Sequence, residues 1–188
     1  MALTPSTMVR IGTPMPAFRL PDAEGRLLDA TELEGAPVLV AFICNHCPYV
    51  KHIAPVFSSL ARELMAQGMA VVAINSNDFA QYPDDSPERM LQEIRQRDYA
   101  FPYLVDETQE VAAAFHAACT PDFFVYDRDH RLAYRGQFDD SSPGNERPVT
   151  GNDLRNACLA VLAGAPPEGE QKPSMGCNIK WKPGNAPR

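Results

Sequence analysis

The chain has 188 residues, which is enough for one domain with a sizeable core and short for two. Its formal net charge of −7 at pH 7 and its pI near 5.0 argue against a nucleic-acid surface or a polybasic membrane anchor. Neither a nucleic acid nor a membrane is therefore expected among its partners.

The amino-terminal segment, MALTPSTMVRIGTPMPAFRL, carries no targeting pattern. It has no continuous apolar stretch of signal-peptide length and no small-residue cleavage site. No apolar run in the sequence approaches membrane-spanning length, and no Gly-rich phosphate loop occurs in it. We expect a mature cytoplasmic protein that uses no organic cofactor.

The first half of the sequence predicts a hairpin followed by a parallel strand–helix–strand unit. Apolar residues alternate on both sides of the turn DAEG at 22–25, as in a β-hairpin. Residues 36–44 are the continuous β-branched and aromatic run of a strand buried on both faces. Helical spacing of apolar residues begins at Pro48 and ends at Gly68, and MAVVAIN follows as a second buried strand. Two strands joined by a helix in this way are parallel, with a right-handed crossover.

The second half predicts three further helices and a second hairpin. One helix opens with Ser86 as its N-cap and Pro87 at its first position. The strand FPYLVDET leads into the helix TQEVAAAFHAA. Residues 119–138 contain two apolar runs joined by the turn DRDH, which predicts an antiparallel hairpin. A closing amphipathic helix ends at Gly164.

The last residues, 165–188, are rich in Pro, Gly and Lys and show no regular period. They are expected to form a tail, but the tail contains Ile179 and Trp181, so we expect it to dock on the domain. The order of elements predicts an α/β fold, a mixed sheet flanked by helices on both faces. The domain would cover residues 1–164, with the amino-terminal hairpin as an extension.

Five cysteines stand at positions 44, 47, 119, 158 and 177. An odd number without a secretion signal is not a disulfide scaffold, because the cytosol keeps structural thiols reduced. The Cys-x-x-Cys in FICNHCPYVKHIAP is therefore expected to be catalytic or metal-binding.

Cys47 is the better nucleophile of this pair. Proline is favoured at the first helical position, so Pro48 places Cys47 at the N-cap. A thiolate there faces unpaired backbone N–H groups, and such surroundings lower a thiol pKa from about 8.5 to roughly 3.5–7.5. His46 would add a positive charge when protonated. Cys44 is the nearest resolving partner, and the pair lies at the carboxyl end of a parallel strand, where open α/β sheets place their chemistry.

Thr120-Pro121 is the second feature that suggests a site. An X-Pro bond just before an apolar run is a candidate for a cis peptide, although a trans proline that starts a strand is the commoner case. The polar residues NSND at 75–78 follow the second parallel strand and should line the same edge as the cysteines. Capping of the next turn is their ordinary role.

Four strings, CNHCPYVKH, VVAINSND, CTPDFFVYD and GCNIKWKPG, occur in this order. With them the chain resembles the thioredoxin superfamily, in its redoxin and peroxiredoxin-like (AhpC/TSA-like) branch, over residues 10–164. The resemblance implies a thioredoxin-like fold and a redox-active cysteine at a helix N-terminus. It also implies that Thr120-Pro121 is cis, lies against the reactive sulfur and presents its backbone to an extended peptide. Protein or small-molecule disulfides and thiols would be the partners.

The register departs from ordinary thioredoxins. Alignment on the strand LVAF and the helix proline puts Cys47 at the first-cysteine position and Val50 at the second. His46 replaces the tryptophan that usually precedes the motif, and Ala41 replaces the buried acid of the strand. The peroxiredoxin pattern also departs here, because Cys44 and Val40 stand where its threonine and proline are expected.

Several alternatives stay open. Arg135 is the candidate guanidinium for a thiol peroxidase that uses Cys47, with a surface arginine as the ordinary interpretation. Cys119 and Cys177 compete with Cys44 as resolving thiols, and each has simple packing as its alternative. Cys158 is expected in the core.

Metal binding is the alternative from another functional class. A single Cys-x-x-Cys supplies two of the four ligands that zinc needs, and His46, His52, Cys119 or Cys177 would have to complete the set. His116 and His130 are more typical of a helix face and a turn. The sequence favours redox chemistry over a zinc or copper site, so no metal ligand is assigned. The preferred function is thiol–disulfide exchange by Cys47, with Cys44, His46, Thr120 and Pro121 around it.

Overall fold

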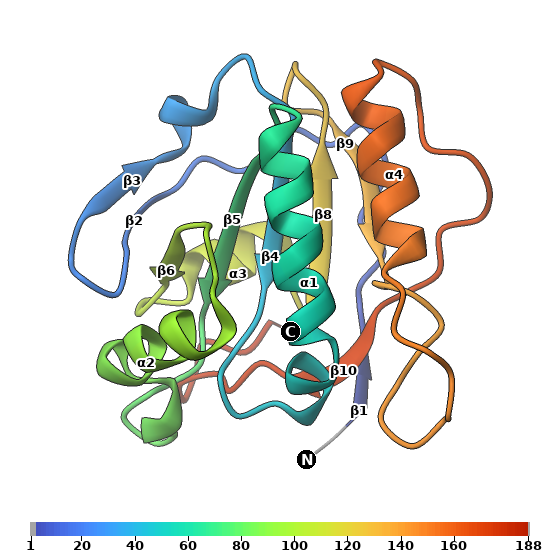
Figure 1. Ribbon diagram of the computed structural model, residues 1–188. Helices are drawn as coiled ribbons and strands as arrows, with labels where there is room; N and C mark the ends of the chain where they lie inside the picture. Colours follow the sequence, from blue (N-terminus) through green and yellow to red (C-terminus); the bar gives the residue numbers. More distant parts are fainter. Residues whose placement is uncertain (1–2, 188) are drawn as a thin grey trace.

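The computed structural model describes residues 3–187, and its centre is a five-stranded mixed sheet (Figure 1). The strand order is β6-β5-β4-β8-β9. β4 (Val38–Phe42), β5 (Ala70–Asn75) and β6 (Tyr103–Val105) are parallel, whereas β8 (Asp122–Tyr126) and β9 (Leu132–Gly136) run antiparallel to their neighbours. The predicted parallel unit and the late hairpin are both confirmed.

Helices cover both faces of this sheet. Figure 1 shows α1 (Pro48–Ala66) and α4 (Asn152–Leu162) in front of it and α3 (Glu110–Phe115) behind it. α2 (Pro87–Arg97) lies beside β6 and starts with Ser86, whose side chain accepts a hydrogen bond from the N–H of Arg89. The predicted capping of this helix is therefore confirmed.

The central strand divides the core into two layers. Leu39, Ala41 and Ile43 pack with α1 and α4, whereas Val38, Val40 and Phe42 pack with α3. Because side chains alternate along a strand, a fully buried strand needs apolar residues at every position. This explains why 36–44 shows a continuous apolar run. Residues 43–47 then join the carboxyl end of β4 to the start of α1.

Two smaller sheets complete the fold. β2 (Arg19–Pro21) and β3 (Leu27–Asp29) form the predicted hairpin, followed by the 3₁₀ turn η1 (Ala30–Leu33). The other sheet has the order β1-β10-β7. It joins β1 (Leu3–Pro5), β10 (Met175–Asn178) and β7 (Cys119–Thr120), all antiparallel.

This last sheet corrects two sequence-based expectations and adds a strand, β1. The apolar run that begins at Cys119 is divided at Pro121, because proline has no N–H for a ladder, and its two parts belong to different sheets. The tail is not irregular throughout, since β10 pairs on both of its edges. β1 was not predicted at all. Within residues 3–187, no helix combines the length and apolarity needed to cross a bilayer.

Candidate active site

Cys47 caps the amino-terminal end of α1, as predicted. Its backbone is extended, Pro48 takes the first helical position, and its side chain is fully buried. The Sγ atom lies 3.2 Å from the carbonyl oxygen of Thr120 and 3.0 Å from Sγ of Cys177. Two non-bonded sulfurs this close need little movement to reach the disulfide bond length of about 2.05 Å.

The Thr120–Pro121 peptide bond is cis, as the resemblance implies. Thr120 belongs to β7, so its carbonyl is held beside Sγ of Cys47 by strand pairing with β10. Its hydroxyl lies 3.4 Å from Sγ of Cys44. Both cysteines of the Cys-x-x-Cys therefore contact the residue that precedes the cis-proline.

The sulfurs of this cluster differ sharply in acidity. A hydrogen bond from Cys44 is the largest influence on Cys47, and with the bond from Cys177 it outweighs burial and lowers the pKa of Cys47 to about 4. Burial, and then the bond to Cys47, raises the pKa of Cys44 well above its ordinary value. The same two causes raise the pKa of Cys177 to about 12. These influences favour the thiolate form of Cys47 and the thiol forms of Cys44 and Cys177.

His46 forms a pair with Asp85, a residue of the short 3₁₀ turn η2 (Pro83–Asp85). The His46 Nδ1 atom lies 2.6 Å from Oδ2 of Asp85. Asp85 is buried and also accepts hydrogen bonds from the N–H of Asn45, at 2.7 Å, and from the amide of Asn77, at 2.8 Å. The imidazole stacks on the ring of Tyr82.

Each partner of this pair changes the acidity of the other. The hydrogen bond to Asp85 raises the pKa of His46. Burial raises the pKa of Asp85, but the bonds from His46 and Asn77 outweigh it, and the net pKa of this carboxyl is lowered. The pair therefore favours a positive imidazolium beside Cys47.

Asp85 is the main residue of the site that the sequence did not identify. Ala41 leaves β4 without the buried acid expected there, and Asp85 supplies a buried acid from another element. The sequence contains Asp84 and Asp85 side by side, yet only Asp85 is buried. Asn77, in the polar loop after β5, does more than cap a turn, because its side chain binds both Asp85 and the backbone N–H of Lys180 in the tail.

A three-ligand cluster is the strongest support for the metal alternative. Ligand atoms of Cys44, His46 and Asp85 lie within 4.8 Å of one another. However, His46 Nδ1 and Asp85 Oδ2 already bind each other, so a cation would have to replace that hydrogen bond.

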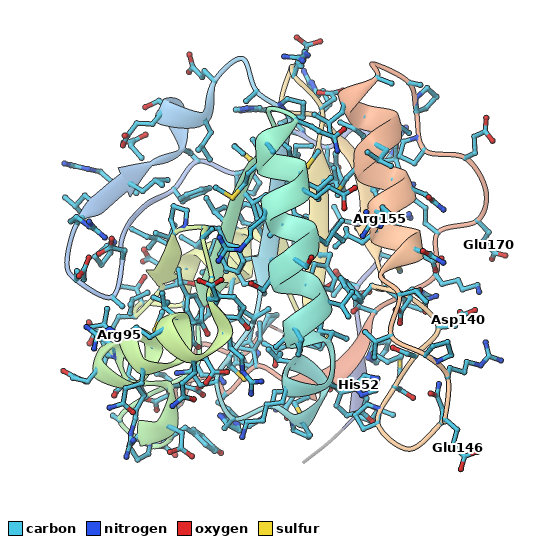
Figure 2. The ribbon with its side chains drawn as sticks, viewed as in Figure 1. His52, Arg95, Asp140, Glu146, Arg155 and Glu170 are labelled. Atoms are coloured by element: carbon cyan, nitrogen blue, oxygen red, sulfur yellow. The ribbon has the colours of Figure 1, made fainter. Side chains whose placement is uncertain are left out.

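The other histidines lie in different surroundings. His52 lies near the start of α1, beside the loop that carries Asp140 and Glu146 (Figure 2), and its Nε2 atom is 3.2 Å from Oγ of Ser141. His116 ends α3, and His130 lies in the late hairpin turn with Nε2 near two backbone carbonyls.

Two candidates from the sequence, Cys119 and Arg135, have other partners, and Cys158 lies in the core. Cys119 is buried and its Sγ contacts the carbonyl of Pro121, at 3.6 Å. Cys158 is buried in α4 within the core, as expected. The Arg135 guanidinium binds the carbonyl of Val9 and the amide oxygen of Gln171, both at 2.6 Å.

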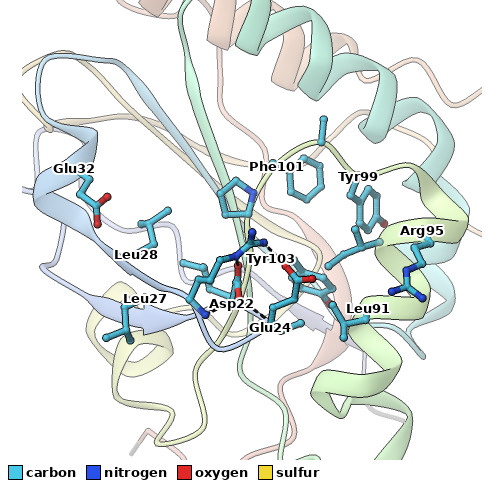
Figure 3. A pocket seen from close by; sticks show the side chains of 16 residues that line it. Asp22, Glu24, Leu27, Leu28, Glu32, Leu91, Arg95, Tyr99, Phe101 and Tyr103 are labelled. Atoms are coloured by element: carbon cyan, nitrogen blue, oxygen red, sulfur yellow. Dashed lines mark hydrogen bonds and ion pairs between the residues drawn. The ribbon is translucent and has the colours of Figure 1, made fainter.

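Two cavities differ in their relation to the cysteines. One of about 680 Å³ is lined by Tyr49, His52, Pro121, Ser174 and Met175, among others, and so adjoins the cis-proline. Another, of about 480 Å³, lies between the β2–β3 hairpin and α2 (Figure 3). Its lining combines aliphatic, aromatic and charged residues and includes no cysteine. The first cavity is the one that can admit a molecule near the cis-proline.

Comparison with known proteins places this geometry in context. The model of the AhpC/TSA family matches residues 11–135, which include Cys44, Cys47 and Pro121 but not Cys177. The structure of an uncharacterized conserved protein from Geobacillus kaustophilus is similar over 97% of this chain and 98% of that one, with 49% identity and a TM-score of 0.95. The similarity therefore includes the tail.

Two more distant proteins carry names. A putative thiol:disulfide interchange protein DsbE from Chlorobium tepidum covers 82% of this chain and 99% of its own, with 19% identity and a TM-score of 0.66, and so supports the thioredoxin-like fold. Thiol-disulfide oxidoreductase ResA from Halalkalibacterium halodurans is 29% identical over 110 residues, 58% of either chain. The match thus spans less than two thirds of that relative.

Proposed function

Because the chain belongs to the AhpC/TSA family, we propose that it is a thiol–disulfide oxidoreductase whose nucleophile is Cys47. One observation carries the proposal. Cys47 stands at the N-cap position of α1, its pKa is lowered to about 4, and its sulfur lies 3.0 Å from that of a second cysteine, Cys177. A thiolate is the attacking species in disulfide exchange, and a nearby thiol can complete the reaction.

In the proposed reaction, the Cys47 thiolate attacks one sulfur of a substrate disulfide and the other sulfur leaves as a thiolate. Cys44 and the His46–Asp85 pair support this step by stabilising the negative charge on the Cys47 thiolate. Cys44 donates a hydrogen bond to the thiolate, and the imidazolium of His46 adds a favourable positive charge. Thr120 and the cis-proline Pro121 place their own backbone next to the sulfur of Cys47. The related oxidoreductase names support the same class of reaction.

The test is the reduction of a disulfide substrate with dithiothreitol as electron donor. Cys47→Ser should abolish turnover above the uncatalysed rate, because serine is not ionised at neutral pH. Cys158→Ser is the matched control, since Cys158 is an equally buried cysteine that belongs to another element, α4. Turnover that survives in Cys47→Ser would refute the proposal.

A thiol peroxidase is the second candidate, and the acidity of Cys47 favours it. Peroxide attack needs a thiolate of this kind. Against it, Cys44 stands where peroxiredoxins carry threonine, and the Arg135 guanidinium is engaged by Val9 and Gln171. Consumption of hydrogen peroxide coupled to a thiol donor would distinguish the two, and we expect it to be slower than disulfide reduction.

A further inference from the structure

The carboxyl-terminal tail brings Cys177 to the nucleophile as part of a paired strand. β10 is the middle strand of the β1-β10-β7 sheet, and Cys177 stands opposite Thr120 in the register. Further along, the N–H of Ile179 donates to the carbonyl of Ala118, and the N–H of Lys180 donates to the side chain of Asn77. The position of Cys177 is thus fixed by backbone pairing on both edges of its strand.

The contact between β10 and β7 is unusually close at Gly176. A Cβ atom added to this glycine would overlap the carbonyl oxygen of Thr120. Only glycine lets the tail approach β7, the strand that precedes Pro121. The residue after Gly176 is Cys177, the cysteine that contacts Cys47. The edge of β7 that faces the tail is therefore paired with the chain's own β10 at Thr120.

A strand edge beside a reactive sulfur is a place where an extended polypeptide could add as a further strand. In this chain β10 already occupies that edge. We infer that the tail is a built-in substrate strand: Cys177 is the thiol that resolves Cys47, and external substrates are small disulfides that do not need the Thr120 edge. This inference rests on the proposed function and adds the resolving residue and the substrate class.

The reaction balances in atoms and electrons. The Cys47 thiolate attacks a small disulfide RSSR, forming Cys47–S–S–R and releasing RS⁻. The Cys177 thiol gives up its proton to a released thiolate, attacks Sγ of Cys47, forms the Cys47–Cys177 disulfide and releases the second RS⁻. The substrate gains two electrons and the two protein thiols lose them. A small dithiol then restores both cysteines.

The state of Cys47 also controls when Cys177 can react. The hydrogen bond to Cys47 and its negative charge both help to raise the pKa of Cys177, after burial. Both influences disappear once Cys47 carries R, because a mixed disulfide has no charge. Cys177 is therefore held as a thiol until the first exchange has taken place.

Disulfide mapping tests the resolving residue. The reduced full-length protein is treated with one equivalent of hydroxyethyl disulfide, quenched in acid, and analysed by mass spectrometry. We expect a Cys47–Cys177 bridge in the wild type, in Cys44→Ser and in Cys158→Ser. In Cys177→Ser the hydroxyethyl adduct should remain on Cys47. A Cys44–Cys47 bridge in the wild type, or no adduct in Cys177→Ser because another thiol has removed it, would overturn the inference while leaving the proposed function intact.

A comparison of a small and a polypeptide substrate tests whether the tail blocks the strand edge at Thr120. The wild type should reduce hydroxyethyl disulfide with a kcat/KM at least about tenfold above that for insulin. A polypeptide that cannot pair with the strand edge loses one or two backbone hydrogen bonds, and about tenfold is what these bonds contribute. Gly176→Val, which forces β10 away from Thr120, should narrow this ratio, because the opened strand edge favours insulin alone, whereas the displacement of Cys177 slows the resolving step for both substrates. A wild-type preference for insulin would overturn the inference even if Gly176→Val fails to fold.

Discussion

Replacing Cys44 with alanine should make Cys47 a weaker acid. Cys44 provides the largest of the interactions that lower the pKa of Cys47, and alanine removes that hydrogen-bond donor from a buried site. Serine keeps an O–H at the same position, so Cys44→Ser is the matched control. The comparison separates the donor function of Cys44 from any role of its sulfur in exchange.

The expected magnitude follows from the acidity of Cys47. Its pKa of about 4, against an ordinary 9.0, corresponds to about 7 kcal/mol of preference for the thiolate at about 1.4 kcal/mol per pKa unit. Several hydrogen bonds share this preference, and that from Cys44 is the largest. We therefore expect Cys44→Ala to raise the pKa of Cys47 by at least about one unit, which is tenfold in the thiol–thiolate equilibrium.

Ultraviolet absorbance of the thiolate, followed over a pH titration, measures this pKa without requiring a reagent to enter the buried site. The Cys47→Ser variant supplies the background. The pH dependence of the free energy of unfolding should report the same change in the pKa of Cys47. Because the folded pKa lies below the unfolded one, the thiolate's contribution is complete above pH 9 and is lost as the pH falls toward about 4. Cys44→Ala should lose it at higher pH. A pKa in Cys44→Ala equal to that of the wild type would refute the assigned role of Cys44.

Three further predictions concern charges and metal around the site. Asp85→Asn should lower the pKa of His46, because it removes the carboxylate that binds Nδ1; an unchanged NMR titration of His46 would contradict the pairing. Burial raises the pKa of Asp122 to about 8, so its contribution to stability is complete below 3.8 and is lost as the pH rises to about 8. Urea unfolding should accordingly show Asp122→Asn gaining on the wild type by about 1.4 kcal/mol per pH unit across that range, and a constant difference would disprove the raised pKa. Protein purified without chelator should contain less than one zinc ion per chain, because a cation must break the His46–Asp85 bond, and stoichiometric zinc that is lost in Asp85→Asn would favour the metal site instead.

Local signals were enough to predict that Cys47 stands at the start of α1. Pro48 marks the start of α1, and that alone places Cys47 at the N-cap. The central sheet was equally accessible, because a strand buried on both faces such as β4 is apolar at every position.

The residues and strands that surround Cys47 could not be predicted in the same way. β1 and β10 are short, contain proline or glycine, and pair across almost the whole chain, so no local pattern marks them. Asp85 becomes a site residue only through burial, which its sequence neighbour Asp84 does not share. The short distance between Cys177 and Cys47 depends on the register of β10 against β7. From the sequence, Cys177 could be given only as one of several possible resolving thiols.

The β1-β10-β7 sheet also has a consequence for the order in which the protein matures. Its pairing of Leu3 with Cys177, and of Cys177 with Thr120, joins segments far apart in sequence, whereas the five-stranded sheet lies between residues 38 and 136. Contacts of such long range form late, because a long loop must close before they are rewarded. A chain emerging from the ribosome would thus carry Cys47 without Cys177 beside it. Cys47 would acquire its full acidity only in the last stage of folding, which limits wrong disulfide partners while the protein is being made.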